Sequence, residues 1–249
     1  MVQDNNSMNG KNGHNGQHHD DNTPNIIRFS DHRPVKVKKV HPPMINLPLF
    51  TKILLAIMIT VQVIVFALGF IDPQMVDIIF SYGGFIPASW SPGNFQWWTP
   101  LTLLTFSFLH DGWIHLGINV LMLAAFGSGI EKMLGAKRML QIFAASTLAA
   151  IAAHFLFNIH SVGVVVGVSG AISGYFGALL WIMKQQNTLG NAQNSMTPFI
   201  VIWIVTAIGF GMMGAPGGGE IAWVAHIGGF FGGLGAAWWL LKPNNGLRR

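Results

Sequence analysis

The side chains best able to do chemistry here are a serine, two histidines and an asparagine in otherwise apolar stretches. They are Ser169, His226, His115 and Asn119. A serine hydroxyl becomes a useful nucleophile when a base takes its proton, and neutral imidazole is the usual base near pH 7. Attack on a carbonyl creates an oxyanion, which backbone N–H groups and His or Asn side chains can stabilise. We therefore expect acyl transfer, with Ser169 as nucleophile and His226 as general base.

The oxyanion hole of such a site would be formed by His115, Asn119 and the backbone N–H of Ser169. Asp111, which could cap a helix, is the one acidic residue within the apolar stretches; none is left to complete a triad, so the sequence implies a Ser-His dyad. The chain has no Cys, which excludes thiolate catalysis, disulfides and Cys-based zinc sites. The histidines His14, His18 and His19 could bind a metal weakly, but they lie in a polar low-complexity stretch, so we expect a solvated tail rather than a metal site.

Helical spacing brings these residues to one depth. His115 and Asn119 are four apart, so they project from one face of a helix, and Asp111 could cap the start of that helix. Ser169 begins a later apolar segment, and His226 lies about one turn into the last one. Because all three helices would start at the outer face of a membrane, the four side chains are expected to meet just below that face.

The elements that must position these residues are membrane-spanning helices. Hydrophobic residues make up 51% of the chain and charged residues only 9%, a balance that soluble domains rarely have. Crossing about 30 Å of hydrocarbon takes about 20 helical residues. Apolar segments of roughly this length lie at 47–70, 101–127, 138–157, 168–184, 197–214 and 222–241. The sequence therefore predicts an all-α membrane protein with six transmembrane helices.

The 14 basic residues predict the orientation of these helices. They lie before or at the first segment, between the second and third, at the end of the fourth and after the sixth. The opposite connections, at 71–100, 158–167 and 215–221, contain none. By the positive-inside rule both termini are cytoplasmic. The basic run before the first segment is then a lipid-surface signal rather than a nucleic-acid patch.

The composition divides the chain into three parts. Residues 1–46 are polar and rich in Asn, Gly and His, so we expect a disordered cytoplasmic tail. Residues 47–241 hold the membrane domain, and residues 242–249 form a short basic cytoplasmic tail. The long outer connection at 71–100 carries several aromatic residues, which favours a structured element in the membrane interface; an ordinary loop is the alternative.

Glycine spacing predicts close contact between the last helix and the helix that begins with the serine. Gly170 and Gly174 are four apart, and the stretch HIGGFFGGLG contains the same spacing twice. Small residues at this spacing let membrane helices approach closely, which would bring Ser169 and His226 within hydrogen-bonding range. The pattern is common in membrane spans, so generic packing around an incidental serine remains the alternative reading of the glycines alone.

Three stretches on successive segments carry a family resemblance: FLHDGWIHLGINVLMLAAFGSGIEKMLG, GVSGAISGYFG and AHIGGFFGG. In this order they resemble the rhomboid family of intramembrane serine proteases, over about residues 47–241. The resemblance implies a six-helix bundle of the rhomboid type with a long interfacial first loop. It also implies an endopeptidase that cleaves transmembrane proteins near the outer membrane boundary through an acyl-enzyme, without a cofactor.

The resemblance gives the nucleophile, base and oxyanion roles to the same four residues. Around them we expect supporting roles for Gly167, Gly170, His110 and Ser173. A structural Gly-x-x-x-Glu-x-x-x-Gly element on the cytoplasmic side falls on Gly127, Glu131 and Gly135. Ser173 is a departure, because the family often has an aromatic ring there that stacks on the catalytic histidine. For His110 we expect a structural role in the loop, although it could line the entrance to the site.

Alternatives from other classes fit less well. A soluble α/β-hydrolase would need a glycine where the chain has Ala171, and an alternating strand pattern that is absent. A transporter would show repeated halves, which the sequence lacks. A catalytically inactive rhomboid-like protein that binds or sorts membrane clients remains an alternative, although the presence of both Ser169 and His226 argues against it. The expected partners are transmembrane substrates and membrane lipid, not nucleic acid, and the minimal six-span form implies a bacterial cytoplasmic membrane.

Overall fold

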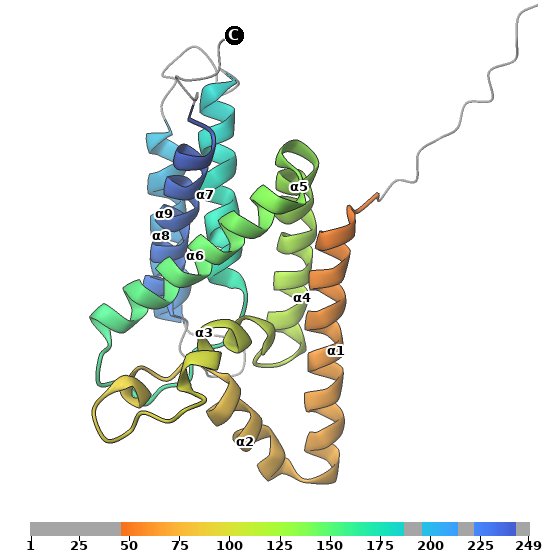
Figure 1. Cartoon of the computed structure of the whole chain (residues 1–249), viewed down its shortest axis with the longest axis vertical. Coiled ribbons are helices and arrows are strands. Elements are labelled where there is room, and N and C mark those ends of the chain that lie inside the picture. The colour runs from red at the N-terminus through yellow and green to blue at the C-terminus, as the bar shows by residue number, and fades with distance from the viewer. Residues whose placement is uncertain (1–45, 187–195, 214–221, 243–249) are drawn as a thin grey trace, which may run out of the picture. The chain divides into compact units, whose positions relative to one another are not determined.

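The computed structural model describes residues 46–186, 196–213 and 222–242, and this part of the chain is helical (Figure 1). Its long helices are α1 (Leu49–Ile71), α6 (Ala136–Phe157), α7 (Ser169–Gln185), α8 (Thr197–Met213) and α9 (Trp223–Leu240). A further continuous helical stretch consists of α4 (Trp113–Met122), the π-helical turn η5 (Leu123–Gly127) and α5 (Ser128–Leu134). The all-α prediction is confirmed for the described part, whereas the predicted N-terminal tail lies outside it, apart from Asn46.

Among the described residues, three helical stretches are long and apolar enough to cross a membrane. They are Leu49–Ile71, Trp113–Leu134 and Ala136–Phe157. The other three expected spans are also helices, but α7, α8 and α9 are shorter or less apolar. A count of six crossings therefore stays a prediction.

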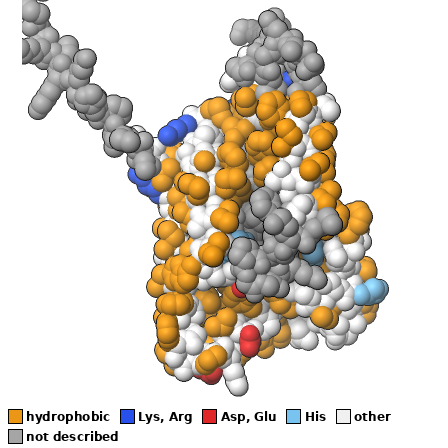
Figure 2. All heavy atoms as spheres, turned by 180° about the vertical axis from the view of Figure 1, so that it is seen from behind, with side chains coloured by type: hydrophobic (Ala, Val, Ile, Leu, Met, Phe, Trp, Pro, Cys, Tyr) orange, Lys and Arg blue, Asp and Glu red, His pale blue; other side chains and the backbone are white. Residues whose placement is uncertain are grey.

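Hydrophobic side chains cover much of the described surface (Figure 2). On α1, Val63 and Ile64 are 48% and 51% exposed, and on α8 Ile202 and Val205 are 64% and 63% exposed. Water would penalise so much exposed apolar area, whereas lipid tails solvate it without cost. This surface is that of an integral membrane protein.

The second predicted span, 101–127, is wrong at both ends. Residues 99–108 form the short helices η3 (Thr99–Leu101), α3 (Thr102–Thr105) and η4 (Phe106–Phe108), and the long helix runs from Trp113 to Leu134. The break falls at Gly112, whose φ of +87° is readily adopted only by glycine. Gly112 is also the N-cap residue, so Asp111 does not cap the helix as predicted.

The long connection at 71–100 contains short helices, and its position in the membrane interface stays a prediction. It contains α2 (Pro73–Gly83) and η2 (Pro87–Trp90). The carboxylate of Asp72 accepts a hydrogen bond from Gln74 N at 2.9 Å, and Pro73 occupies the first helical position, where no N–H is needed. Asp72 itself is extended, which ends α1 and turns the chain into α2.

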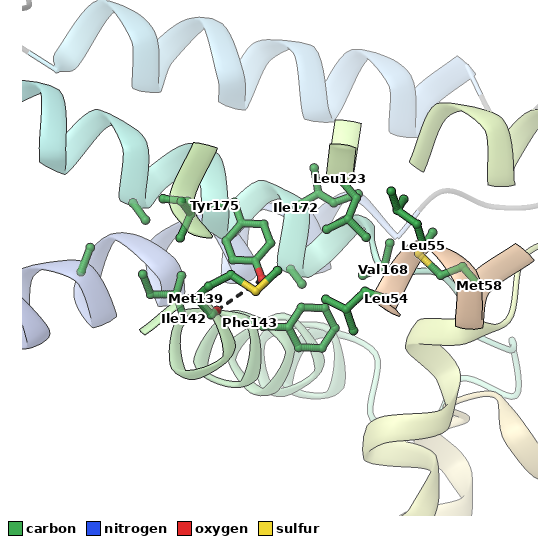
Figure 3. Packing of buried hydrophobic residues seen from close by; sticks show 14 of the residues in the cluster. Leu54, Leu55, Met58, Leu123, Met139, Ile142, Phe143, Val168, Ile172 and Tyr175 are labelled. Carbon is green, nitrogen blue, oxygen red and sulfur yellow. Dashed lines mark hydrogen bonds between the residues drawn. The ribbon is translucent and has the colours of Figure 1, made fainter. Parts of the chain in front are cut away.

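The largest buried cluster joins α1, the α4–α5 stretch, α6 and α7 (Figure 3). Tyr175 on α7 is fully buried, and its hydroxyl donates to the carbonyl of Met139 on α6 at 3.3 Å. Leu54 and Met58 of α1 lie at the other end of the same cluster. These contacts fix α7, which begins at the candidate nucleophile.

The carboxylate of Glu131 ties α5 to the first turn of α1. It accepts hydrogen bonds from Phe50 N at 3.0 Å, from Thr51 N at 2.7 Å and from Thr51 Oγ1 at 2.7 Å. The first N–H groups of a helix lack partners within the helix, so this carboxylate satisfies two of them. Gly135, at φ +80°, then turns the chain into α6.

Candidate active site

Ser169 and His226 come together from two helices that are distant in sequence. Ser169 is the first residue of α7, and His226 lies in the first turn of α9. Ser169 Oγ and His226 Nε2 are 2.8 Å apart, a hydrogen-bonding distance. In the tautomer of His226 with the proton on Nδ1, the hydroxyl donates to Nε2, which is the arrangement for proton transfer from Oγ to the imidazole.

Glycines allow the two helices to lie this close. A Cβ on Gly229 would collide with the carbonyl of Gly170, and one on Gly233 would collide with the carbonyl of Gly174. The close approach of α7 and α9 expected from the glycine spacing is therefore present. Gly228 faces α6 instead, where a Cβ would collide with Ala153.

Gly167 connects this pair to the expected oxyanion residues. Its φ is +105°, and its N–H donates to the carbonyl of Phe106 at 2.8 Å. A Cβ there would lie 2.9 Å from His115 Nε2 and 3.6 Å from Asn119 Nδ2. His115 and Asn119 thus face the backbone two residues before Ser169, on one face of the α4–α5 stretch.

The hydrogen bonds of His115 and Asn119 suit oxyanion donors. The backbone N–H of Asp111 donates to His115 Nδ1 at 3.3 Å, which leaves the ring proton on Nε2. Asn119 is 3% exposed, and its Nδ2 has no hydrogen-bond partner among the described residues. Buried donors are normally satisfied, so an unused one aimed at Gly167 is available to a bound oxyanion.

Ser173 makes a hydrogen bond at the position where the family resemblance implies an aromatic ring. Its side chain is 1% exposed, and its hydroxyl donates to the carbonyl of Ser169 at 2.8 Å. This bond ties the first turn of α7 to the residue that carries the nucleophile. The expectation that a hydroxyl at this position finds a nearby partner is confirmed.

The sequence analysis missed the residues that hold the segment before the nucleophile. Phe85 and Val165 exchange backbone hydrogen bonds of 2.9 and 2.8 Å, and Ala88 N donates to Ser161 O at 3.0 Å. The connection at 71–100 therefore positions the chain that enters α7. The β-branched run VGVVVGV was a signal for this extended segment.

His110 lies in the turn before α4, outside the spanning helix, and is 1% exposed. Burial, and secondarily the nearby His115, lowers the pKa of His110 to about 4. It is therefore neutral near pH 7, with its ring centroid 5.2 Å from that of His115. His154, in the last turn of α6, is partly buried. In the described part of the chain, no group of three or more His, Asp or Glu residues could hold a metal ion.

Comparisons with known proteins point to one family. The family model described as "Rhomboid domain" matches residues 94–243. "Rhomboid protease GluP" of Bacillus subtilis is 32% identical over 151 residues, which cover 61% of this chain and 27% of that protein. "Putative rhomboid protease YdcA" of the same organism is 31% identical over 145 residues, covering 57% of this chain and 66% of that protein. "RHOMBOID-like protein 7" of Arabidopsis thaliana is 30% identical over 132 residues, covering 53% of this chain and 40% of that protein.

Proposed function

Because the chain belongs to the rhomboid family, we propose that it is an intramembrane serine endopeptidase that cleaves transmembrane protein substrates. Two of its relatives carry the name rhomboid protease, although the matched segment is less than two thirds of either protein. The observation that carries the proposal is the 2.8 Å contact between Ser169 Oγ and His226 Nε2. A catalytically inactive client-binding protein would have no use for this contact.

Acylation follows from the geometry of the pair. Ser169 Oγ attacks the scissile carbonyl carbon while its proton moves to His226 Nε2. The negative oxygen is stabilised by Ser169 N–H, His115 Nε2–H and the Asn119 amide, with help from the positive end of the α7 dipole. His226 then gives its proton to the leaving amine, and the acyl group stays on Oγ.

Deacylation repeats these steps with water. Water adds to the ester carbonyl carbon and passes a proton to His226, and the C–Oγ bond breaks as that proton returns to Ser169 Oγ. The acid product leaves, and the dyad is restored. The mechanism needs no acidic residue as a third catalytic member, and it needs no metal or cofactor.

We also propose where the reaction takes place. The candidate nucleophile lies at the start of α7, at the end of the helices opposite Lys132 and Lys184. If those lysines are cytoplasmic, the site opens just below the outer face of a bacterial cytoplasmic membrane. Water can then reach it without crossing the bilayer.

Substitution of the dyad tests this function. We expect Ser169→Ala or His226→Ala to lower cleavage of a model transmembrane substrate in proteoliposomes by about a thousandfold or more. We also expect a fluorophosphonate to label wild type at Ser169, and to leave the Ser169→Ala variant unlabelled.

Matched controls keep this test specific. Ser81→Ala changes an exposed serine of α2, and His160→Ala changes an exposed histidine of an outer loop, so both should cleave normally. Undiminished cleavage by Ser169→Ala would refute the mechanism. A folded wild type that binds transmembrane clients but neither cleaves nor labels would be a client-binding protein.

A further inference from the structure

A cavity of about 330 Å³, open to the surface on one side, lies between α1, α2 and the turn before α4, next to the oxyanion side of the site. Much of its wall is apolar and includes the rings of Phe66, Phe70 and Phe80. Three polar residues, Gln62, His110 and Asp111, complete the lining. The family model begins at residue 94, so the α1 and α2 walls lie outside the matched region.

Two of the polar residues are buried. Gln62 is 5% exposed in the middle of the apolar helix α1, where Thr60 is the one polar neighbour within a turn on either side. His110 is 1% exposed; the backbone of Phe108 lies near its ring, but neither ring nitrogen makes a hydrogen bond of good geometry among the described residues. Buried polar groups that lack protein partners are usually satisfied by ordered water. A water occupies about 30 Å³ in the liquid, so the cavity has room for several.

Among the described residues, only the side chain of His115 lies between this cavity and the candidate active site. His110 lines it and contacts the ring of His115, with 5.2 Å between the ring centroids. His115 Nε2 in turn faces Gly167, two residues before Ser169. A neutral histidine at His110 can donate one hydrogen bond and accept another, so it can hold water on this route.

We propose that this cavity is filled with water and supplies the water that hydrolyses the acyl-enzyme. The inference rests on the proposed function, because it concerns the second half of that reaction. Water held by Gln62 and His110 passes His115 and adds to the carbonyl carbon of the ester on Ser169. It gives a proton to His226 Nε2, the C–Oγ bond breaks, and the proton returns to Oγ.

The first test measures whether the cavity contains water. It does not depend on enzymatic activity. The chain has no Cys, so Gln62→Cys and Val63→Cys each create a single thiol, one lining the cavity and the other on the outer surface of α1. A charged methanethiosulfonate reacts with the thiolate, which forms in water and not in lipid. In proteoliposomes we expect the thiol at position 62 to react about tenfold faster or more than its neighbour. Equal, slow rates at both positions overturn the proposal.

The second test separates deacylation from nucleophile activation. With a nitrophenyl ester, the burst reports acylation and the slower steady rate reports hydrolysis of the acyl-enzyme. We expect Gln62→Leu and His110→Phe to slow the steady rate about fivefold or more, with burst amplitude and fluorophosphonate labelling rate unchanged. The control Val76→Ala alters an apolar wall of the same cavity and should leave all three unchanged.

The outcomes of the second test are distinct. Gln62 lies on a different helix from His115, so Gln62→Leu remains decisive if His110→Phe disturbs the fold. An unchanged steady rate in a folded variant shows that water arrives elsewhere and overturns the proposal. Equal losses of labelling and steady rate show a distorted dyad and also overturn it. A wild type without burst or labelling defeats the proposed function instead, and the thiol test still decides whether the cavity is hydrated.

Discussion

At the scale of the residue, Gly167 is the position with the least freedom to change. Its φ of +105° disfavours any residue with a Cβ, and a Cβ would also lie 2.9 Å from His115 Nε2. The backbone turn and the approach of the oxyanion histidine thus both need glycine here. One substitution should disturb both.

We expect Gly167→Ala to lower kcat for substrate cleavage by about 10²-fold, because it displaces His115 from the developing oxyanion. The backbone strain should cost about 1–3 kcal/mol of unfolding free energy. The control is Gly117→Ala, on the same helix as His115, where a Cβ meets nothing within 4 Å. Normal kcat in Gly167→Ala would show that His115 does not act through this contact.

At the scale of the element, the π turn η5 keeps one face of a long helix directed inward. His115, Asn119, Leu123, Gly127 and Glu131 recur every four residues. In an α-helix of 3.6 residues per turn, such a series drifts by about 40° per step. A π turn holds more residues than an α turn and so corrects the drift. His115 and Asn119 near the start of this helical stretch and Glu131 near its end can therefore all face the interior of the protein.

The contact between α7 and α9 is the element-scale basis of the dyad. We expect Gly229→Ala to force these helices apart, because the new Cβ would collide with the Gly170 carbonyl. Overpacking of this kind costs about 1–3 kcal/mol, and the separation should break the bond between Ser169 and His226.

The readouts are unfolding free energy in mixed micelles and the rate of fluorophosphonate labelling. Gly235→Ala is the matched control on the same helix, since a Cβ there meets nothing within 4 Å. Normal labelling in Gly229→Ala would mean that the dyad does not depend on this contact.

At the scale of the whole membrane domain, charge separates along the helices. The described basic residues Lys52, Lys132, Lys137, Arg138, Lys184 and Lys242 lie at the end where α1 starts and α7 and α9 finish. Asp72, Asp77 and Asp111 lie at the other end, and the buried Glu131, which binds the first turn of α1, is the one described acidic residue at the basic end. Figure 2 shows blue side chains toward one end of the visible face and red ones toward the other. This distribution supports a cytoplasmic position for the basic end.

Single cysteines in the Cys-free chain test this orientation. We expect a membrane-impermeant maleimide to label Gln96→Cys in intact cells, and to label Lys132→Cys only after the membrane is opened. Both positions are exposed, so burial does not explain a difference. The reverse labelling pattern would invert the proposed topology and place the site on the cytoplasmic side.

Local sequence patterns predict the helical class, a helix that begins at Ser169, and a close glycine contact between that helix and the one that carries His226. Each of these follows from local spacing, because helical periodicity and small-residue intervals are properties of short stretches. Only the tertiary structure decided that the second helix starts at Trp113, since a positive φ at Gly112 depends on what surrounds it. The pairing of Phe85 with Val165, 80 positions apart, and the cavity shared by Gln62 and His110 also arise from long-range packing, which no local pattern records.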